Sequence, residues 1–409
     1  MATITQSAPR RAEARDRHGR AGEARGRSND AARAAPAPLT SIAASDWADL
    51  AERAIEPNGY YLPGWELAVS AFAPGRSGAG AIAAWRTDSD CEPTCLIGLL
   101  PAVTLWQAFK IPLPALVNAD AYGTLGTPLL DRDDADLAMA RLMKQARLTG
   151  ARAILLRNMS LDGPAMQTIA ATLRVQDLQP QILQRYQRAA LDAGRDGEAL
   201  LREALGTKRL KELRRQHNRL ADHGEVKFEV ACTPQEVASA LEIFLALEAS
   251  GWKGARGTAL SQREGDARFI RQATSALAER GQCEIITLRA GTLPVAAGVV
   301  LRHQQRAFFF KIGIDENFAK FSPGVQLTLE LTRHLCADLE ITSADSTAHQ
   351  GHKMIDPIWR ARITIGDVLI PLRPRDPMVA IIAAALKTHN GLLAAARGTV
   401  RGARSLLRR

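Results

Sequence analysis

The sequence has few cysteines, few aromatic residues and no long apolar run. Its 409 residues include 5 cysteines, at positions 91, 95, 232, 283 and 336. This small, odd number is typical of a reducing cytosol and argues against a disulfide framework. Cys91 and Cys95 form a C-x3-C pair, but no second Cys or His pair follows at matching spacing, so we do not expect zinc there. The longest strongly apolar run, residues 378–386, is far shorter than the ~20 residues that span a bilayer.

The first 35 residues also lack the apolar segment of a secretory signal. Their arginine and alanine content is that of a mitochondrial transit peptide, but four interspersed acids argue against one. We therefore expect a cytoplasmic protein, at most peripheral to the inner face of the membrane.

The excess of positive charge is confined to the two ends of the chain. Residues 1–40 carry eight arginines against four acids, and residues 373–409 carry eight Lys or Arg against Asp376 alone. These net charges of +4 and +7 leave −1 for the rest, out of a total of +10. A folded nucleic-acid-binding face usually carries the excess itself. The ends are therefore read as solubilising segments, with weak contact to an anionic membrane or to tRNA as the alternative.

What the sequence does contain is the composition and pattern of a mixed α/β protein. Apolar residues make up 46% and charged residues 23%, and the length suffices for two domains. Short apolar stretches alternate with amphipathic helical patterns, which is typical of α/β architecture. The predicted strands are 79–86, 94–103, 153–157, 181–189, 226–231, 283–289, 295–303, 305–312 and 340–343. The predicted helices are 46–55, 137–149, 163–173, 198–224, 235–250, 264–279 and 324–336.

Five regions follow from this pattern. Residues 1–40 are expected to be a disordered basic arm, because they are polar, rich in Ala, Arg and Gly, and end in an Ala-Pro repeat. Two α/β halves, 41–196 and 225–374, are similar in length and in their order of elements, so a duplicated fold is possible. A basic helix, 197–224, links them. Residues 375–409 read as a basic amphipathic tail of two helices separated by Asn390-Gly391.

The linking helix carries a dense row of cations. Leucines form its apolar stripe, and the remainder is covered by Lys208, Arg209, Lys211, Arg214, Arg215 and Arg219. This arrangement suits a solvated face. It also suits a dock for an anionic acceptor, such as a nucleotide sugar, a polysaccharide carrier or a tRNA acceptor arm.

The turn Ser322-Pro323-Gly324 opens a helix directly after three predicted strands. A helix start leaves backbone N–H groups unpaired and carries partial positive charge, so it can bind phosphate. Proline fixes φ where an N–H would be unused, and glycine allows close approach of a ligand. By itself this signal is that of any ordinary helix start.

Its place after an antiparallel hairpin resembles the central part of the GNAT acyltransferase fold. Several stretches resemble the FemAB-related branch that includes CelD-like and BioF2-like acetyltransferase domains. They are KRLKELRRQHNRL at 208–220, LEASGWKG at 247–254, AERGQCEIITLRAGTLPVAAGVVLRHQQRAFFFKIGIDENFAKFSPGVQL at 278–327 and ADSTAHQGHKMIDPIW at 344–359. The first half would then be a degenerate GNAT-like partner domain. The full Arg/Gln-x-x-Gly-x-Gly/Ala loop of typical GNAT enzymes is absent, which leaves room for a donor other than acetyl-CoA.

The resemblance implies a binding site for acetyl-CoA or another acyl-CoA, with no metal. It places Ser322, Pro323, Gly324, Val325 and Gln326 at the pyrophosphate. It also places the backbone of Ala296, Ala297 and Gly298 against the pantetheine arm, and a glycine inside a strand often marks such close approach.

Acyl transfer needs a base and a group that stabilises the oxyanion. The catalytic candidates are Asp345, which follows a strand, Lys353 a few residues later, and Asp315 in the preceding turn. The candidates for substrate binding are Lys311, His349 and Trp252. Each has a structural alternative: the aspartates as caps or ion-pair partners, Trp252 as a hydrophobic plug, and His349 with His352 as a polar turn. Zinc at the two histidines lacks a third ligand.

No cysteine or serine stands in a nucleophile motif, so we expect direct transfer in a ternary complex. The predicted activity is acyl-CoA-dependent N- or O-acyl transfer to a small-molecule or saccharide acceptor, by resemblance in exopolysaccharide or cell-envelope synthesis. One alternative is a FemAB-type transferase that uses aminoacyl-tRNA, although the neutral body argues against a large tRNA footprint. The other is a non-catalytic scaffold tethered by its C-terminal helices.

Overall fold

A computed structural model describes residues 36–73, 79–87, 93–119 and 122–406, the side chains of 394–406 excepted. The predicted disordered arm therefore lies almost entirely outside the described residues, as does Cys91 of the C-x3-C pair. Residues 34–409 form one compact unit. No helix in the described part of the chain is long and apolar enough to cross a membrane.

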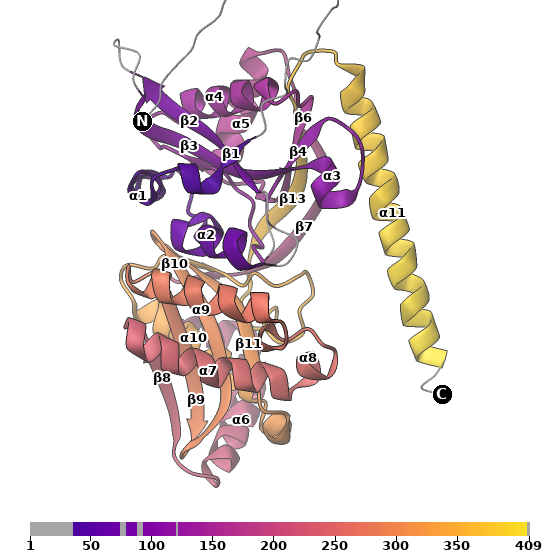
Figure 1. Cartoon of the computed structure of the whole chain (residues 1–409). Coiled ribbons are helices and arrows are strands. Elements are labelled where there is room, and N and C mark those ends of the chain that lie inside the picture. Colours follow the sequence, from indigo (N-terminus) through magenta and orange to yellow (C-terminus); the bar gives the residue numbers. More distant parts are fainter. Residues whose placement is uncertain (1–35, 74–78, 88–92, 120–121, 407–409) are drawn as a thin grey trace, which may run out of the picture. The chain divides into compact units, whose positions relative to one another are not determined.

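The first half consists of seven strands and five helices with two short 3₁₀ turns (Figure 1). Its helices are α1 (Ala44–Arg53), α2 (Pro63–Phe72), α3 (Leu105–Phe109), α4 (Ala135–Leu148) and α5 (Pro164–Val175), and its 3₁₀ turns are η1 (Leu39–Ser41) and η2 (Gly59–Tyr61). Its strands are β1 (Ala37–Pro38), β2 (Gly80–Thr87), β3 (Pro93–Thr104), β4 (Ala115–Asn118), β5 (Leu129–Leu130), β6 (Ala153–Ser160) and β7 (Gln181–Asp192).

The remaining elements follow the basic helix α6. The helices are α6 (Gly197–Ala221), α7 (Pro234–Ser250), α8 (Trp252–Ala255), α9 (Glu264–Ala278), α10 (Pro323–Ala337) and α11 (Pro377–Leu406), and the 3₁₀ turns are η3 (Leu260–Gln262) and η4 (Glu316–Phe321). The strands are β8 (Val226–Ala231), β9 (Cys283–Ala290), β10 (Leu293–His303), β11 (Arg306–Ile314), β12 (Ser343–Asp345) and β13 (Ala361–Pro371).

The two halves repeat one topology. In the first, β2, β3 and β4 form an antiparallel series, α4 follows, and β6 then pairs in parallel with β4. In the second, β9, β10 and β11 form the same antiparallel series, α10 follows, and β12 pairs in parallel with β11. Two main helices precede the series in each half, α1 and α2 or α7 and α9. The fold is thus a mixed α/β, GNAT-like architecture with two tandem halves.

The halves also exchange strands, which joins them into one sheet of 13 strands. β7 of the first half pairs with β12, and β13 comes back from the end of the second half to pair with both β6 and β7. The central position of β13 agrees with its sequence, because Ile365, Val368 and Ile370 are fully buried there. β13 was not among the predicted strands. β13 lies within the predicted region 225–374, yet it completes the sheet of region 41–196.

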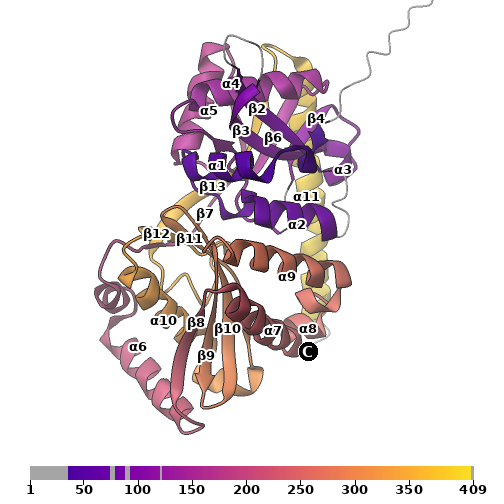
Figure 2. The same ribbon diagram turned by 60° about the vertical axis from the view of Figure 1, so that its left-hand side comes forward.

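Helices cover both faces of the sheet in the second half (Figures 1 and 2). α7 and α9 pack on one face of β9–β11, in a cluster with Phe308 and Phe310. α10 packs on the other face with Phe309, and α6 lies against α10. The alternation of Phe308, Phe309 and Phe310 between two cores is the period-2 geometry of a strand.

Three local predictions are wrong. The tail is one helix, α11, rather than two, since an Asn-Gly pair inside a helix costs only about 1 kcal/mol against alanine and does not have to end it. Residues 252–254, which lie between the predicted helices 235–250 and 264–279 and were therefore expected to be a loop, belong to the short helix α8. The strand predicted at 340–343 begins only at Ser343, because residues 339–342 form the turn that leads into it.

Candidate active site at the free edge of β11

The site is created by the divergence of two parallel strands. β11 and β12 pair only from Arg306–Phe308 to Ser343–Asp345. Beyond Phe308 no described strand pairs with β11 on the side away from β10. The Phe309 carbonyl accepts from Thr347 Oγ1 at 2.6 Å and the Ile312 carbonyl from Lys253 Nζ at 2.9 Å, which leaves the other backbone groups of this edge for a ligand. The register between β10 and β11 shifts at Val299/Val300, which leaves Phe310 as an extra, bulged residue at the start of the free stretch. Bulges of this kind re-aim backbone groups beside active sites.

The predicted pantetheine strand is one strand away from this edge. Ala296, Ala297 and Gly298 lie on β10, where each is paired with β9 on one side and with β11 on the other. Their backbone groups are used within the sheet, and all three residues are buried. The prediction that they face the pantetheine arm is therefore corrected. The strand that can accept an extended ligand is β11.

The free edge leads to the N-terminus of α10. Ser322 caps this helix in the left-handed region at φ 54°, and its carbonyl accepts the N–H groups of Val325 and Gln326. Proline at position 323 has no N–H, and the Gly324 N–H has no acceptor among the described residues. The end of this helix keeps its partial positive charge.

Two residues of this turn have structural tasks. The Gln326 side chain donates to the Leu213 carbonyl at 2.8 Å and ties α10 to α6, so it points away from the helix end. Gly324 is buried, and a Cβ added there would lie 3.0 Å from the Met354 sulfur. Met354 follows the 346–353 segment, which therefore reaches the start of α10.

A charged cluster borders the same edge. Glu248 at the end of α7 is buried, and its Oε1 accepts from Lys253 Nζ at 3.3 Å and Lys311 Nζ at 3.1 Å. Its Oε2 accepts the Leu260 N–H at 2.9 Å. Lys253 also donates to the Ile312 carbonyl at 2.9 Å, which lies on the free stretch of β11. Burial lowers the pKa of Lys253, and nearby Glu248 opposes this shift.

Two histidines complete this region. The rings of His349 and His352 lie 5.3 Å apart in an edge-to-face arrangement. His352 is half-buried, and its Nδ1 has no hydrogen-bond partner among the described residues. Burial lowers the pKa of His352, and the charges of His349 and Lys253 lower it further. A neutral imidazole can accept a proton at pH 7.

The predicted aspartates have partners that argue against catalysis. Asp345 is buried in an ion pair with Arg188 of β7, each side chain 1% exposed, and its Oδ1 accepts the Thr347 N–H at 2.8 Å. Asp315 caps η4 by accepting the Asn317 N–H at 2.9 Å. Both follow the structural alternative stated for them, as an ion-pair partner and as a cap.

The remaining predicted residues, Lys353 and Trp252, have exposed side chains. Lys353 is exposed in the turn after His352. Trp252 is half exposed on α8, and the Arg256 guanidinium lies 4.8 Å from the centroid of its ring. The backbone N–H of Trp252 donates to Glu316 Oε1 at 2.7 Å. Because it is half exposed, Trp252 is not a hydrophobic plug. Its hydrogen bond with Glu316 holds α8 against η4. Glu248, Lys253 and His352, which lie in the same region, were not among the predicted site residues. The signal for His352 was present, since it stands three residues from His349.

His349 also lines a cavity of about 560 Å³ in the first half. Its other walls include Arg157 and Asn158 of β6, Tyr186 of β7 and Asp367 of β13. These four are joined in part, because Tyr186 Oη donates to Asn158 Oδ1 at 3.1 Å and the Asn158 N–H donates to Asp367 at 3.0 Å. The 346–353 segment thus connects the free edge with a polar cavity.

Residues 207–353 match a family model described as an acetyltransferase (GNAT) domain. The chain therefore carries a GNAT acetyltransferase domain over this range and is an acyltransferase. No curated protein matches the chain.

Solved structures show the same fold over most of the length. A structure of FemX matches with a TM-score of 0.52 and 11% identity, over 84% of this chain and 98% of that one. The C-terminal domain of a candidate lysylphosphatidylglycerol synthetase from Agrobacterium fabrum matches with a TM-score of 0.50 and 14% identity, over 84% and 95%. A conserved protein of unknown function from Bacteroides thetaiotaomicron matches with 0.50 and 13%, over 81% and 98%. At these identities the likeness concerns the fold alone.

Proposed function

We propose that this acyltransferase moves an acyl group from a CoA thioester directly to an amine or a hydroxyl. The observation that carries the proposal is the free edge of β11, which runs from the bulge at Phe310 to the N-terminus of α10. An extended, amide-containing arm can pair with such an edge, and the helix end favours the pyrophosphate that follows it.

The residues beside the edge supply the remaining chemistry. The acceptor nitrogen or oxygen attacks the thioester carbon, the carbon–sulfur bond breaks, and CoA leaves as a thiolate, which becomes the thiol by taking the proton that the acceptor gives up through His352. His352 takes the proton of the acceptor, because its lowered pKa keeps the ring neutral. Lys311 and Lys253 place positive charge where the carbonyl oxygen becomes negative.

The acceptor belongs, in this proposal, to the polar cavity beside His349, whose hydrogen-bonding walls suit a hydroxyl-rich or amine-bearing molecule. A saccharide of exopolysaccharide or cell-envelope synthesis fits this description. It also fits the CelD-like and BioF2-like resemblance of the sequence, which forms part of the proposal.

The decisive test is thermal unfolding with and without acetyl-CoA, CoA and longer acyl-CoAs. A ligand that binds only the native state adds about 2.7 kcal/mol at a hundredfold excess over its Kd. Gly324→Asp places a carboxylate at the helix end and should abolish the shift. Gly324→Ala adds the same Cβ without the charge and presses equally on Met354, so it should keep most of the shift. No shift with any CoA species in the folded wild type would refute the proposal.

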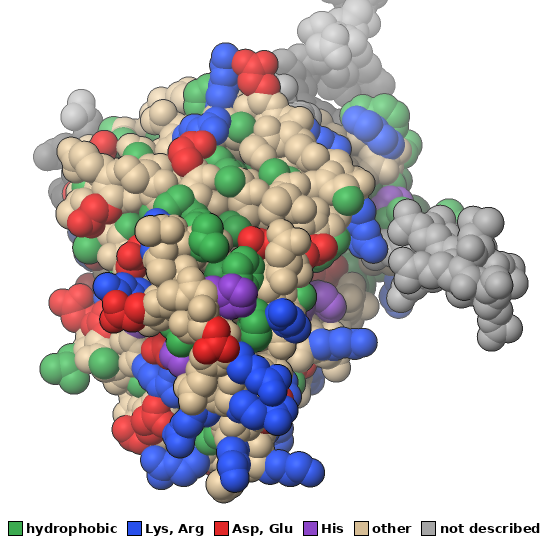
Figure 3. Space-filling model, turned by 90° about the horizontal axis from the view of Figure 1, so that it is seen from below, with side chains coloured by type: hydrophobic (Ala, Val, Ile, Leu, Met, Phe, Trp, Pro, Cys, Tyr) green, Lys and Arg blue, Asp and Glu red, His purple; other side chains and the backbone are tan. Residues whose placement is uncertain are grey.

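A second candidate donor is aminoacyl-tRNA, and α6 is the observation that favours it. Five cations of α6 line a shallow cavity of about 810 Å³, namely Lys208, Arg209, Lys211, Arg214 and Arg215. Figure 3 looks onto the part of the molecule that holds α6 and shows Lys and Arg side chains gathered there. This donor predicts tRNA binding that weakens steeply with salt and is lost in Lys208→Glu/Arg209→Glu. The CoA proposal predicts that this double variant keeps its thermal shift with acetyl-CoA.

A further inference from the structure

Helix α11 is apolar on two opposite sides. Its inner side packs into the core of the first half through Val379, Ile382 and Leu386. A surface helix normally presents polar residues on the other side. Here the outer side presents Ile381, 51% exposed, and Leu392, 67% exposed, with Ala384 and Thr388 exposed between them. The Thr388 hydroxyl donates to the Ala384 carbonyl at 3.0 Å. Over the described side chains this outer stripe is covered by nothing.

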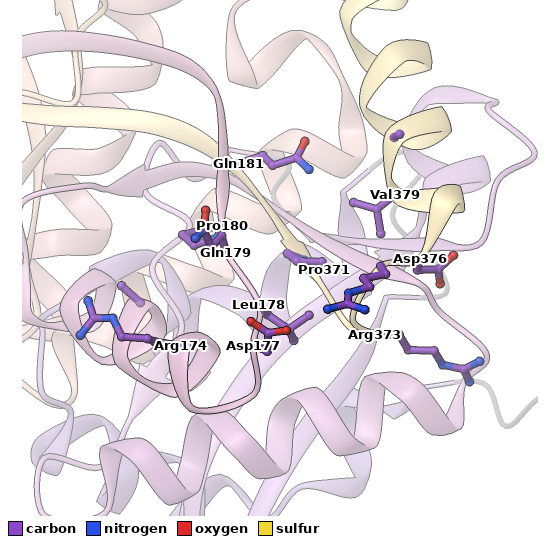
Figure 4. Close-up of a pocket in the computed structure, with 13 residues that line it drawn as sticks. Arg174, Asp177, Leu178, Gln179, Pro180, Gln181, Pro371, Arg373, Asp376 and Val379 are labelled. Carbon is purple, nitrogen blue, oxygen red and sulfur yellow. The ribbon is translucent and has the colours of Figure 1, made fainter.

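Cations lie at the start of α11 and along it, and the one acid at its start is paired. Arg373 and Arg375 lie in the turn before α11, and Lys387 is exposed one turn and a half beyond Ile381. Neither arginine has an acidic partner among the described residues, whereas Asp376 is paired with Arg152 at 2.9 Å. Figure 4 shows Arg373 and Asp376 beside Val379, where α11 begins.

The same chemistry continues in the sequence of the helix. Residues 394–409 contain five arginines and no acid. No helix of the described part is apolar enough to span a bilayer. Exposed apolar residues together with cations on one helix are the features of a helix that lies in the interface plane of a membrane.

We propose that α11 docks this protein on the surface of an anionic membrane. Ile381 and Leu392 enter the boundary between headgroups and acyl chains, and Lys387, Arg373 and Arg375 contact the lipid phosphates. Charge complementarity favours lipid over a second copy of the chain, since the copy would bring the same cations to the same face. The proposal does not depend on which acyl donor the enzyme uses.

The test is sedimentation of the full-length chain with vesicles. One set contains phosphatidylcholine alone, and the other contains phosphatidylcholine and phosphatidylglycerol at about two to one. We expect binding to the anionic set, weakening with added salt. Ile381→Glu/Leu392→Glu removes the apolar contact and should weaken binding at least about tenfold. Leu339→Glu is the matched control, because this leucine is 98% exposed in the second half, away from α11.

Both variants change exposed side chains, and circular dichroism and thermal unfolding verify that they fold. Arg373→Glu/Arg375→Glu changes two charges outside the apolar stripe and should also weaken binding to the anionic vesicles. Absence of binding to either vesicle set overturns the proposal, as does wild-type binding by Ile381→Glu/Leu392→Glu. Light scattering measures the oligomeric state independently. If the wild type is a dimer, Ile381→Glu/Leu392→Glu is a monomer and neither protein binds vesicles, the stripe contacts a second copy of the chain instead.

Discussion

Two charged clusters lie on either side of the divergence between β11 and β12, and they differ in burial. The junction cluster consists of Arg188, Asp345, His303 and Asn58, all buried, and it joins the two halves. The edge cluster consists of Glu248, Lys253, Lys311 and His352, of which only Glu248 is buried. In the junction cluster the charged groups and His303 have their partners within the protein. In the edge cluster Lys253, Lys311 and His352 are partly exposed.

The difference separates structural from chemical roles. Arg188 donates to Asp345 and to the Thr124 carbonyl at 2.7 Å, and no route for a substrate reaches this pair. His303 accepts the Asn58 N–H at 2.8 Å and donates to the Ala51 carbonyl at 2.9 Å, so it too is held between elements of both halves. A charged group that is fully buried and paired holds the fold. One that is partly exposed beside an unpaired strand edge is available for catalysis.

The largest expected effect is on the junction cluster. Asp345→Ala leaves Arg188 charged and buried without its partner, so the free energy of unfolding should fall by about 3–5 kcal/mol, measured in urea. Arg188→Met/Asp345→Leu removes both charges and should restore much of the loss. If Asp345→Ala instead keeps its stability and loses only activity, Asp345 belongs with the edge cluster after all.

The second effect is acid destabilisation through His303. Burial lowers the pKa of His303 from its usual 6.5 to about 4, so the folded protein holds this ring neutral. Its contribution is fully present above pH 6.5 and is lost as the pH falls toward 4, by about 3 kcal/mol. Urea titrations across this range in wild type and His303→Gln measure it. Equal pH slopes in the two proteins would contradict the assignment.

The third effect belongs to the edge cluster and concerns rate. His352→Gln should lower kcat about a hundredfold, because it removes the proposed base. In the wild type, kcat/KM should rise through a pKa below 6.5 and stay level above it, and this limb should vanish in the variant. The thermal shift with CoA should persist. A variant that keeps the acid limb shows that another group is the base.

The smallest effect is expected for Lys311→Met. Glu248 keeps Lys253 as a partner, so stability should change by less than about 1 kcal/mol. The rate should fall about tenfold, since one of two positive charges near the developing oxyanion is lost. Arg271→Met is the control: it removes an exposed cation whose partner is Glu242 on the outside of α7. Equal losses in both variants would remove Lys311 from the site.

The sequence by itself determined the features that depend on neighbouring residues. The helix predicted at 235–250 is α7, and Thr233 forms a capping box with Glu236 at its start. The hairpin β9–β10, the strand β11 and the start of α10 at Ser322-Pro323 were likewise predicted, as was the resemblance to a GNAT fold. Helix caps, turns and strand alternation act over a few positions, so they can be recognised without knowing the rest of the chain.

Only the tertiary structure decided which distant residues meet. Asp345 is paired with Arg188, 157 residues away, and Lys311 with Glu248, 63 residues away. β13 pairs within the sheet of the first half. The sequence of residues 361–371 cannot predict this pairing, because an apolar strand fits any buried position in a sheet. Burial and long-range pairing place Asp345 in the junction cluster and His352 in the edge cluster. Burial and pairing are properties of the folded chain as a whole.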